Sequence, residues 1–314
     1  FMDRPGGRKQ HQGAVPPIGG LVVMPVFFIL YFLTVPGAMD EWPLFAGLAI
    51  LLITGLIDDR RTIRAGGKFL IQIAVALLIV LAGDGAITNF GDLLGYGPIE
   101  LGWISVPFSI ACLVMMMNAV NMMDGLDGLA GGVAFVVLLC LIFVLWQAGL
   151  SFYAPLAMLA PLSVFLYFNM RHPWRDRAAV FLGDSGSLTL GLVLGYLCIR
   201  VSHLTPQDFP PVSAIWLLVV PVIDALSLFF LRLTRGRHPF SPDRNHLHHR
   251  FLVKGCSVRA TTLWVMAATA VAGVVALLPL AGVPECSLFY AWVAGVVIYM
   301  GYSLRPSADR TFEG

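Results

Sequence analysis

Hydrophobic residues occur along the chain in ten long runs that are separated by short polar stretches. A hydrocarbon core about 30 Å thick needs a helix of roughly 17–25 residues to cross it. The runs approach or reach that length, and the second and third are the shortest. They are 17–36, 43–57, 69–83, 103–118, 129–148, 152–169, 186–202, 210–231, 261–281 and 286–304. The pattern predicts an all-α protein, a polytopic bundle of ten transmembrane helices forming one integral-membrane domain over residues 1–314.

The composition agrees with a membrane protein. Of 314 residues, 58% are hydrophobic and 12% are charged, far outside the range of soluble globular proteins. A net charge of +2 leaves no basic domain for nucleic acid. The five cysteines form no CxxC pair, so we interpret them as small hydrophobic residues. The chain begins with Phe1-Met2-Asp3, and we expect a further segment upstream.

The basic residues follow the alternation of the loops. Every Lys and Arg except Arg200 falls in one set of alternate loops or in the C-terminal tail. Because Lys and Arg accumulate on the cytoplasmic side of membranes, we expect this set to face the cytosol and to carry the active site. Acids of the opposite loops, such as Glu41 and Asp84, show no clustering, and we expect them to lie in plain solvated loops. The cytoplasmic stretches are near 1–16, 58–68, 118–128, 170–185 and 232–260.

One of these stretches places four polar residues three apart between two apolar runs. They are Asn118, Asn121, Asp124 and Asp127, with glycines at 125 and 128. An uncompensated carboxylate costs roughly 2.5–3.5 kcal/mol in the middle of a membrane-spanning helix. We therefore expect the helix to end here, at a wet edge of the membrane, with the carboxylates serving a function.

Two further stretches combine carboxylates with cations or glycines. Asp58-Asp59 directly follow the second run, and four basic residues come after them. This pattern is typical either of a divalent cation site or of a capped helix end with flanking cations. In Phe181-Leu182-Gly183-Asp184-Ser185-Gly186-Ser187 the glycines would let backbone N–H groups face an anion at a helix start. Asp184 would then be free to hold a metal ion, and a simple capped helix start is the alternative.

The remaining polar signals lie in the basic loops. Arg8-Lys9 with nearby glycines suits a phosphate ligand or a simple membrane anchor. The stretch 242–250 has three histidines within four positions, between arginines. Because the arginines would repel a cation, the stretch favours binding of a polyanion or a sugar over a zinc site. A pH-sensitive surface patch is the alternative. Asp224 within the eighth run is either functional or a buried partner for a cation or a helix-packing hydrogen bond.

Taken together, the motifs resemble a known family. RKxHxGxxPxxGG, DD after a span, NxxNxxDGxDGLA, FxGDxGS and PDRxHxHH occur in that order in the polyprenyl-phosphate N-acetylhexosamine-1-phosphate transferases. Here they are Arg8 to Gly20, Asp58-Asp59, Asn118 to Ala130, Phe181 to Ser187 and Pro242 to His249. The resemblance covers nearly the whole chain. Members of this type commonly have eleven spans, so ten with one upstream helix would agree.

The resemblance implies which residues form the site. Asp184 would bind the metal, Mg²⁺ with Mn²⁺ as the alternative. The catalytic residues would be Asp58, Asp59, Asp124, Asp127, His246, His248 and His249. The substrate-binding residues would be Lys9, Asn118, Asn121, Asn169, Phe181, Arg244 and Arg250.

The resemblance also implies individual roles. Asp58 would orient or deprotonate a lipid phosphate with support from Asp59. Asn121 and Asp124 would contact the ribose-diphosphate region, and Asp127 with Phe181 would hold uracil. The histidines and arginines of 244–250 would face the diphosphate and the sugar. Neighbouring carboxylates can exchange roles, and whether Lys68 belongs to the site stays open.

The implied activity is transfer of a sugar 1-phosphate from a UDP-sugar to polyprenyl phosphate, an initiating step of a lipid-linked envelope glycan. PDRNHLHHR resembles the N-acetylglucosamine-type branch of the family, whereas the UDP-MurNAc-pentapeptide branch usually has an acidic residue shortly after its paired histidines, so the resemblance favours UDP-GlcNAc as the donor. UDP-FucNAc and UDP-MurNAc-pentapeptide are the alternatives. The expected partners are the UDP-sugar, undecaprenyl phosphate and the bacterial inner membrane, and a homodimer is compatible with this class. A secondary transporter is the remote alternative, for which broken helices would be expected.

Overall fold

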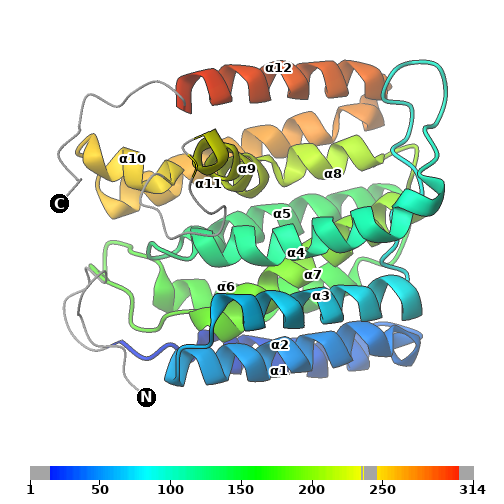
Figure 1. Cartoon of the computed structure of the whole chain (residues 1–314). Helices are drawn as coiled ribbons and strands as arrows, with labels where there is room; N and C mark the ends of the chain where they lie inside the picture. The colour runs from blue at the N-terminus through cyan, green and yellow to red at the C-terminus, as the bar shows by residue number, and fades with distance from the viewer. Residues whose placement is uncertain (1–14, 235, 237–245, 304–314) are drawn as a thin grey trace.

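The computed structural model describes residues 15–234, 236 and 246–303, and helices form nearly all of the regular structure in that part (Figure 1). The long helices are α1 (Gly19–Thr34), α2 (Trp42–Arg60), α3 (Ala65–Ala82), α4 (Ser105–Met123), α5 (Leu129–Gln147), α6 (Tyr153–Asn169), α7 (Gly183–Leu204), α9 (Val219–Thr234), α11 (Val258–Ala276) and α12 (Glu285–Ser303). The short ones are η1 (Ala38–Glu41), η2 (Gly102–Ile104), α8 (Pro211–Leu217), α10 (Leu247–Val253) and η3 (Leu278–Ala281). The predicted all-α class is confirmed for these residues.

Each of the ten predicted apolar runs coincides with helix. Among the described residues, seven helices are long and apolar enough to cross a membrane, and α8 with α9 makes an eighth if the bent pair is one span. Helices α1 and α6 are apolar but shorter. The chain is therefore a multi-pass membrane protein, and the count of ten spans stays a prediction.

The hydrophobic pattern predicts the eighth run, 210–231, as one helix, but in the structure the run is broken into two. Helices α8 and α9 meet at a bend of 79°. The cause is Pro221, which has no N–H to donate and whose ring would clash with the carbonyl of Leu217 if the helix continued. Pro221 is instead the third residue of α9, in the first turn, where the missing N–H costs nothing.

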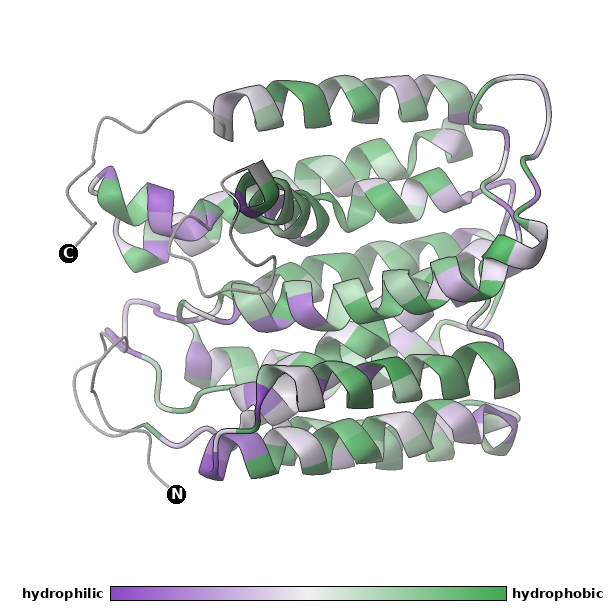
Figure 2. Cartoon of the chain, in the orientation of Figure 1, coloured by the Kyte–Doolittle hydropathy of each residue, from purple (hydrophilic) through white to green (hydrophobic). Residues whose placement is uncertain are grey.

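Helix α7 lies in the centre of the bundle. It packs against α1, α2, α4 and α5, and 83% of an 18-residue apolar stretch of α7 is buried, compared with 6% for the corresponding stretch of α12 at the periphery. Figure 2 shows the hydrophobic middle of the helices and the hydrophilic residues gathered at helix ends and in loops. The burial of α7 fixes its first turn, where Asp184 lies, relative to the surrounding helices.

Glycines allow the first turn of α7 to contact two neighbouring backbones. A Cβ at Gly20 of α1 would lie 2.3 Å from the backbone N of Gly186, and one at Gly55 of α2 would lie 2.3 Å from Cα of Ser185. In addition, the N–H groups of Gly19 and Gly20 donate to the carbonyls of Phe181 and Leu182 at 2.9 Å each. No larger residue fits at these contacts without moving a helix.

The other end of the bundle holds a polar network that the sequence did not indicate. Tyr31 Oη donates to Glu41 Oε2 at 2.5 Å, and Tyr196 Oη donates to the same oxygen at 3.2 Å. Arg200 pairs with Glu41 at 3.7 Å and also with Asp84. The expectation of unclustered acids on this face is therefore wrong, since Arg200, the exception to the loop rule, joins two of them.

We predict that Gly55→Ala destabilises the protein, because its methyl group would overlap the backbone of α7. Overpacking of this kind costs about 1–3 kcal/mol, which should lower Tm by roughly 5 °C. Gly66→Ala is the matched control, since a Cβ there meets nothing within 4 Å. Thermal unfolding in detergent would measure both, and equal Tm values for the two variants would contradict the close approach.

Candidate active site

Four helix ends meet at one end of the bundle, the left end in Figure 1. Helices α2 and α4 end there, and α3 and α7 begin there. Helix α10 is joined to this end through His248, whose ring lies against the turn between α4 and α5. Most of the motifs singled out in the sequence therefore lie in one region, although they are far apart along the chain.

The first turn of α7 is held by Asp59. Its Oδ1 accepts the N–H of Asp184 at 3.0 Å, and its Oδ2 accepts the N–H of Ser185 at 3.4 Å. Gly183 precedes them with φ +77°, a conformation that favours glycine. The first N–H groups of a helix have no intrahelical acceptor, and a carboxylate there also interacts favourably with the positive end of the helix dipole. The anion expected at this helix start is thus supplied by the protein itself.

Lys68 bridges two carboxylates. Its Nζ lies 2.6 Å from Asp58 Oδ2 and 3.0 Å from Asp184 Oδ2. Asp58 Oδ1 also accepts the N–H of Ile63 at 2.5 Å. The Asp58 side chain is 8% exposed and that of Asp184 31%, so Asp184 is the more accessible of the two to a ligand.

Asn121 joins α4 to α7. Its Nδ2 donates to Asp184 Oδ1 at 3.0 Å and to Ser187 Oγ at 2.8 Å. Asn118, nearly one turn earlier, faces α3 instead: its Nδ2 donates to Gln72 Oε1 at 2.6 Å, and Gln72 Nε2 donates back at 3.4 Å. The structure therefore gives Asn118 a helix-packing contact, and its substrate contact stays a prediction.

Asp124 directly follows α4 and is half-buried. Burial raises the pKa of its carboxyl well above the ordinary value, and the charges of Asp184, Asp59 and Asp127 raise that pKa further. The carboxylates of this region thus repel one another at neutral pH. Such repulsion favours a bound cation, which would stabilise the ionised forms.

Asp127 is paired on one oxygen. Arg171 Nε donates to its Oδ2 at 2.7 Å, and the N–H of Ala178 donates to the same atom at 3.3 Å. These contacts tie the turn after α4 to the loop 170–182. The 11% exposure of the Asp127 side chain leaves it a narrow opening for a ligand.

Asn169 and Phe181 border the same loop. Asn169 is 4% exposed, and it accepts the N–H of Gly128 at 2.8 Å and donates to the carbonyl of Val180 at 2.7 Å. Phe181 is half-buried, and its backbone N–H donates to the carbonyl of Pro16 at 3.0 Å. Asn169 therefore supports the shape of the loop, and its direct contact with a substrate stays a prediction.

The rings of the three histidines at the start of α10 form a cluster, here called the histidine stack, in which only His246 and His248 are parallel. The rings of His246 and His248 are 5.5 Å apart and nearly parallel, and those of His248 and His249 are 4.3 Å apart. His248 is 2% exposed, and burial, with the neighbouring histidines, lowers its pKa to about 3. A Cβ at Gly125 would lie 3.0 Å from His248 Nε2. The neutral His248 ring therefore contacts the turn that holds Asp124 and Asp127.

The basic residues of this group are only partly described. The Arg250 guanidinium lies 6.0 Å from the centre of the Tyr302 ring. Lys9 and Arg244 lie outside the described residues.

The oxygen atoms around Asp184 suit a hard divalent cation. Among the described residues, no three His, Cys, Asp or Glu side chains are grouped to hold a metal ion by themselves. Mg²⁺ does not require such a group, since it is usually bound by one or two carboxylates together with substrate phosphates and water. Asp184, with the Asp58 carboxylate nearby, fits that pattern, and the Asn121 NH₂ group holds Oδ1 of Asp184.

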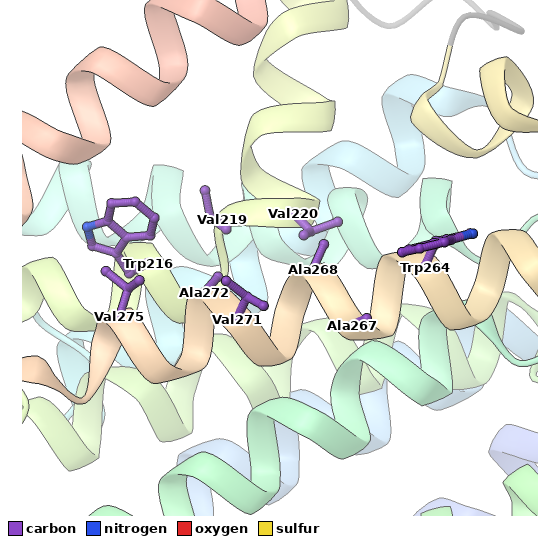
Figure 3. A pocket seen from close by; sticks show the side chains of 9 residues that line it. All are labelled: Trp216, Val219, Val220, Trp264, Ala267, Ala268, Val271, Ala272 and Val275. Carbon is purple, nitrogen blue, oxygen red and sulfur yellow. The ribbon is translucent and has the colours of Figure 1, made fainter.

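An apolar groove lies outside this polar region, between the α8–α9 bend and α11 (Figure 3). Its volume is about 490 Å³, and all nine lining residues are hydrophobic. Trp216 and Trp264 lie at its two ends, with Val220, Ala268 and Val271 between them. The groove exists because the break at Leu218 turns α9 away from the direction of α8.

Sequence reasoning left Lys68 undecided, and the structure brings it between Asp58 and Asp184. The available signal was the short connection between α2 and α3, which places the first turn of α3 beside the end of α2. Arg171 was noted only as a cytoplasmic charge, and no sequence signal indicates its pairing with Asp127.

We predict that Asp124→Asn stabilises the protein at pH 8 without substrate or Mg²⁺. The folded-state pKa of Asp124 is raised, so its carboxyl holds a proton more strongly in the folded protein than in the unfolded chain. The stability therefore falls as the pH rises from the unfolded-state pKa to the folded-state pKa. The amide removes this penalty and should raise Tm by roughly 3 °C. The difference should vanish at pH 4, and a variant less stable than the parent at pH 8 would contradict the account.

Residues 42–202 match glycosyl transferase family 4. Curated relatives extend the similarity over nearly the whole chain. The undecaprenyl-phosphate alpha-N-acetylglucosaminyl 1-phosphate transferase of Escherichia coli strain K12 is 29% identical, covering 97% of this chain and 84% of the relative. The proteins of that name from Salmonella typhimurium and Yersinia pestis are 30% and 27% identical, covering 87% and 97% of this chain and 75% and 84% of the relatives. The chain belongs to glycosyl transferase family 4.

Proposed function

We propose that this protein transfers GlcNAc 1-phosphate from UDP-GlcNAc to undecaprenyl phosphate, giving undecaprenyl-diphosphate-GlcNAc and UMP. An oxygen of the lipid phosphate attacks the phosphorus bonded to the sugar, and the bond to UMP breaks, with UMP leaving with the electron pair. The observation that carries the proposal is the bonded cluster of Asp58, Lys68, Asn121 and Asp184 at one end of an apolar bundle. Family membership and the names of the relatives support it.

Phosphoryl transfer between a lipid and a soluble nucleotide requires a site at the membrane boundary. The acceptor cannot leave the bilayer, and the donor cannot enter it. A cluster at the helix ends, beside apolar spans, meets both conditions. The accumulation of Lys and Arg in the loops of this end supports a cytosolic orientation in a bacterial inner membrane.

On the acceptor side, Asp58 would orient the lipid phosphate and remove its proton, and Lys68 would neutralise phosphate charge. Asp59 would support them indirectly, by holding the first turn of α7. Mg²⁺, or Mn²⁺ in its place, would be held by Asp184 and would neutralise the donor diphosphate. Such reactions depend mainly on positioning and charge neutralisation.

On the donor side, Asn121 and Asp124 would contact the ribose-diphosphate region. Asp127, through its Oδ1 atom, would hold uracil together with Phe181. The histidine stack and Arg250 would contact the diphosphate and the sugar. Lys9, Asn118, Asn169 and Arg244 remain proposed contacts on the same basis of resemblance.

The groove beside α11 would receive part of the acceptor's isoprenoid chain. Its lining is entirely hydrophobic, and it opens beside Val219 and Val220, at the start of the helix that carries Asp224 toward the histidine stack. Contact between an apolar chain and such a surface lowers the free energy of the bound state, because apolar area is removed from water. A homodimer stays compatible with the proposal.

A secondary transporter is the second candidate, because the broken α8–α9 helix is a feature of that class. The buried acid after the break, however, is hydrogen bonded to His246 and Leu247. A carboxylate committed to holding a loop is less suited to binding a transported ion. UDP-FucNAc and UDP-MurNAc-pentapeptide remain the alternative donors.

The purified protein should release UMP from UDP-GlcNAc only when undecaprenyl phosphate and Mg²⁺ are both present. Asp184→Asn should lower kcat by about 10³-fold, because it removes a ligand of the ion that would neutralise negative charge in the transition state. Asp208→Asn, a loop carboxylate at the other end of the bundle, is the matched control and should keep full activity. UMP release by Asp184→Asn at the parental rate would remove the metal assignment, and a panel of UDP-sugars would identify the donor.

Ala268→Trp should fill the groove and raise the KM for undecaprenyl phosphate by roughly 10-fold, since about 1.4 kcal/mol of lost binding corresponds to that factor. The KM for UDP-GlcNAc should not change. Ala270→Trp is the matched control, because Ala270 is exposed on the same helix but does not line the groove. An unchanged acceptor KM in Ala268→Trp would place the isoprenoid chain elsewhere.

A further inference from the structure

Asp224 is a buried acid that the proposed chemistry does not use. It lies on α9, about one and a half turns after the α8–α9 break, and is 7% exposed. Isolated carboxylates are costly at such positions, so its retention requires a partner or a function.

Both carboxylate oxygens of Asp224 bind the start of the histidine segment. Oδ2 lies 2.9 Å from Nδ1 of His246, and Oδ1 accepts the backbone N–H of Leu247 at 2.8 Å. Leu247 is the first residue of α10, so its N–H has no acceptor within that helix. One carboxylate therefore holds a side chain and a helix start together.

These contacts extend from His246 to the proposed donor site. The His246 ring stacks on His248 at 5.5 Å and 11° between planes, and both residues are buried. His248 in turn lies against Gly125, between the carboxylates of Asp124 and Asp127 in sequence. The position of His248 at the site is therefore fixed from behind by Asp224.

We propose that Asp224 is a positioning residue for the transfer reaction, and this inference rests on the proposed function. Its carboxylate accepts a hydrogen bond from His246 Nδ1–H, whether the ring is neutral or cationic, and so leaves Nε2 as the ring nitrogen that Asp224 does not hold. It also anchors the start of α10. A histidine whose Nδ1–H is bound by a carboxylate has a fixed ring orientation and tautomer.

Asp224→Asn separates these two effects. An amide has one acceptor oxygen, whereas the carboxylate offers two. The Leu247 N–H can only donate, so the amide oxygen should face Leu247 and the NH₂ group should face His246 Nδ1. The neutral ring must then accept at Nδ1 and carry its proton on Nε2. The helix start remains bonded, but the His246 tautomer is reversed.

The test combines kinetics with ¹⁵N NMR of histidine-labelled protein in nanodiscs at pH 8, with the His246 signals assigned from His246→Ala. Asp224→Asn should lower kcat by about 10–100-fold with the KM for undecaprenyl phosphate unchanged, and its His246 should carry the proton on Nε2. Adding Asp224→Asn to His246→Ala should cause no further loss of kcat. Ser227→Ala, which removes a buried hydroxyl one turn away on α9, is the control and should leave kcat unchanged.

Parental kcat in Asp224→Asn, or equal losses with and without His246, would overturn the proposal. An unchanged His246 tautomer in that variant would also overturn it. If the parent protein released no UMP, the proposed function would fail, while the tautomer measurement would still decide whether Asp224 sets the state of His246. Asp224→Ala should additionally lower Tm, because it leaves the Leu247 N–H without its acceptor.

Discussion

The hydrogen bonds from the first turn of α7 to Asp59 are the constraint on which the site depends. They join the end of α2 to the start of α7, and they leave the Asp184 side chain directed to Lys68 and Asn121. Glycines at positions 20 and 55 make this junction possible by allowing backbones to touch. The adjacent acids therefore have different contacts. Asp58 pairs with Lys68, and Asp59 holds the first turn of α7.

Charge compensation explains how so many acids can lie beside apolar spans. Lys68 neutralises Asp58 and Asp184, and Arg171 neutralises part of Asp127. Among the described residues no Lys or Arg forms an ion pair with Asp124, and burial together with repulsion from the neighbouring carboxylates raises its pKa. A site with this balance is incomplete without further positive charge, which the proposed Mg²⁺ would supply.

The helices could be predicted from the lengths of the hydrophobic runs, but the site could be predicted only in part. All ten apolar runs became helix because hydrophobic length is a local signal. The break before Pro221 was missed because length was read without the residue that interrupts it. The motifs indicated Asp58, Asp124 and Asp184, but the Lys68 bridge and the Asp224–His246 pair depend on contacts across 116 and 22 positions, which no single-sequence pattern reveals.

We propose that donor, ion and acceptor meet at the start of α7. The most direct measurement is the anomalous scattering of Mn²⁺ in crystals grown with UDP-GlcNAc. The account predicts an ion bound to a carboxylate oxygen of Asp184, at about the 2.0–2.2 Å expected of a small hard cation, with Lys68 moved off that carboxylate. An ion bound at the Glu41–Arg200 end, or more than about 10 Å from Asp184, beyond any direct or water-mediated contact, would contradict it.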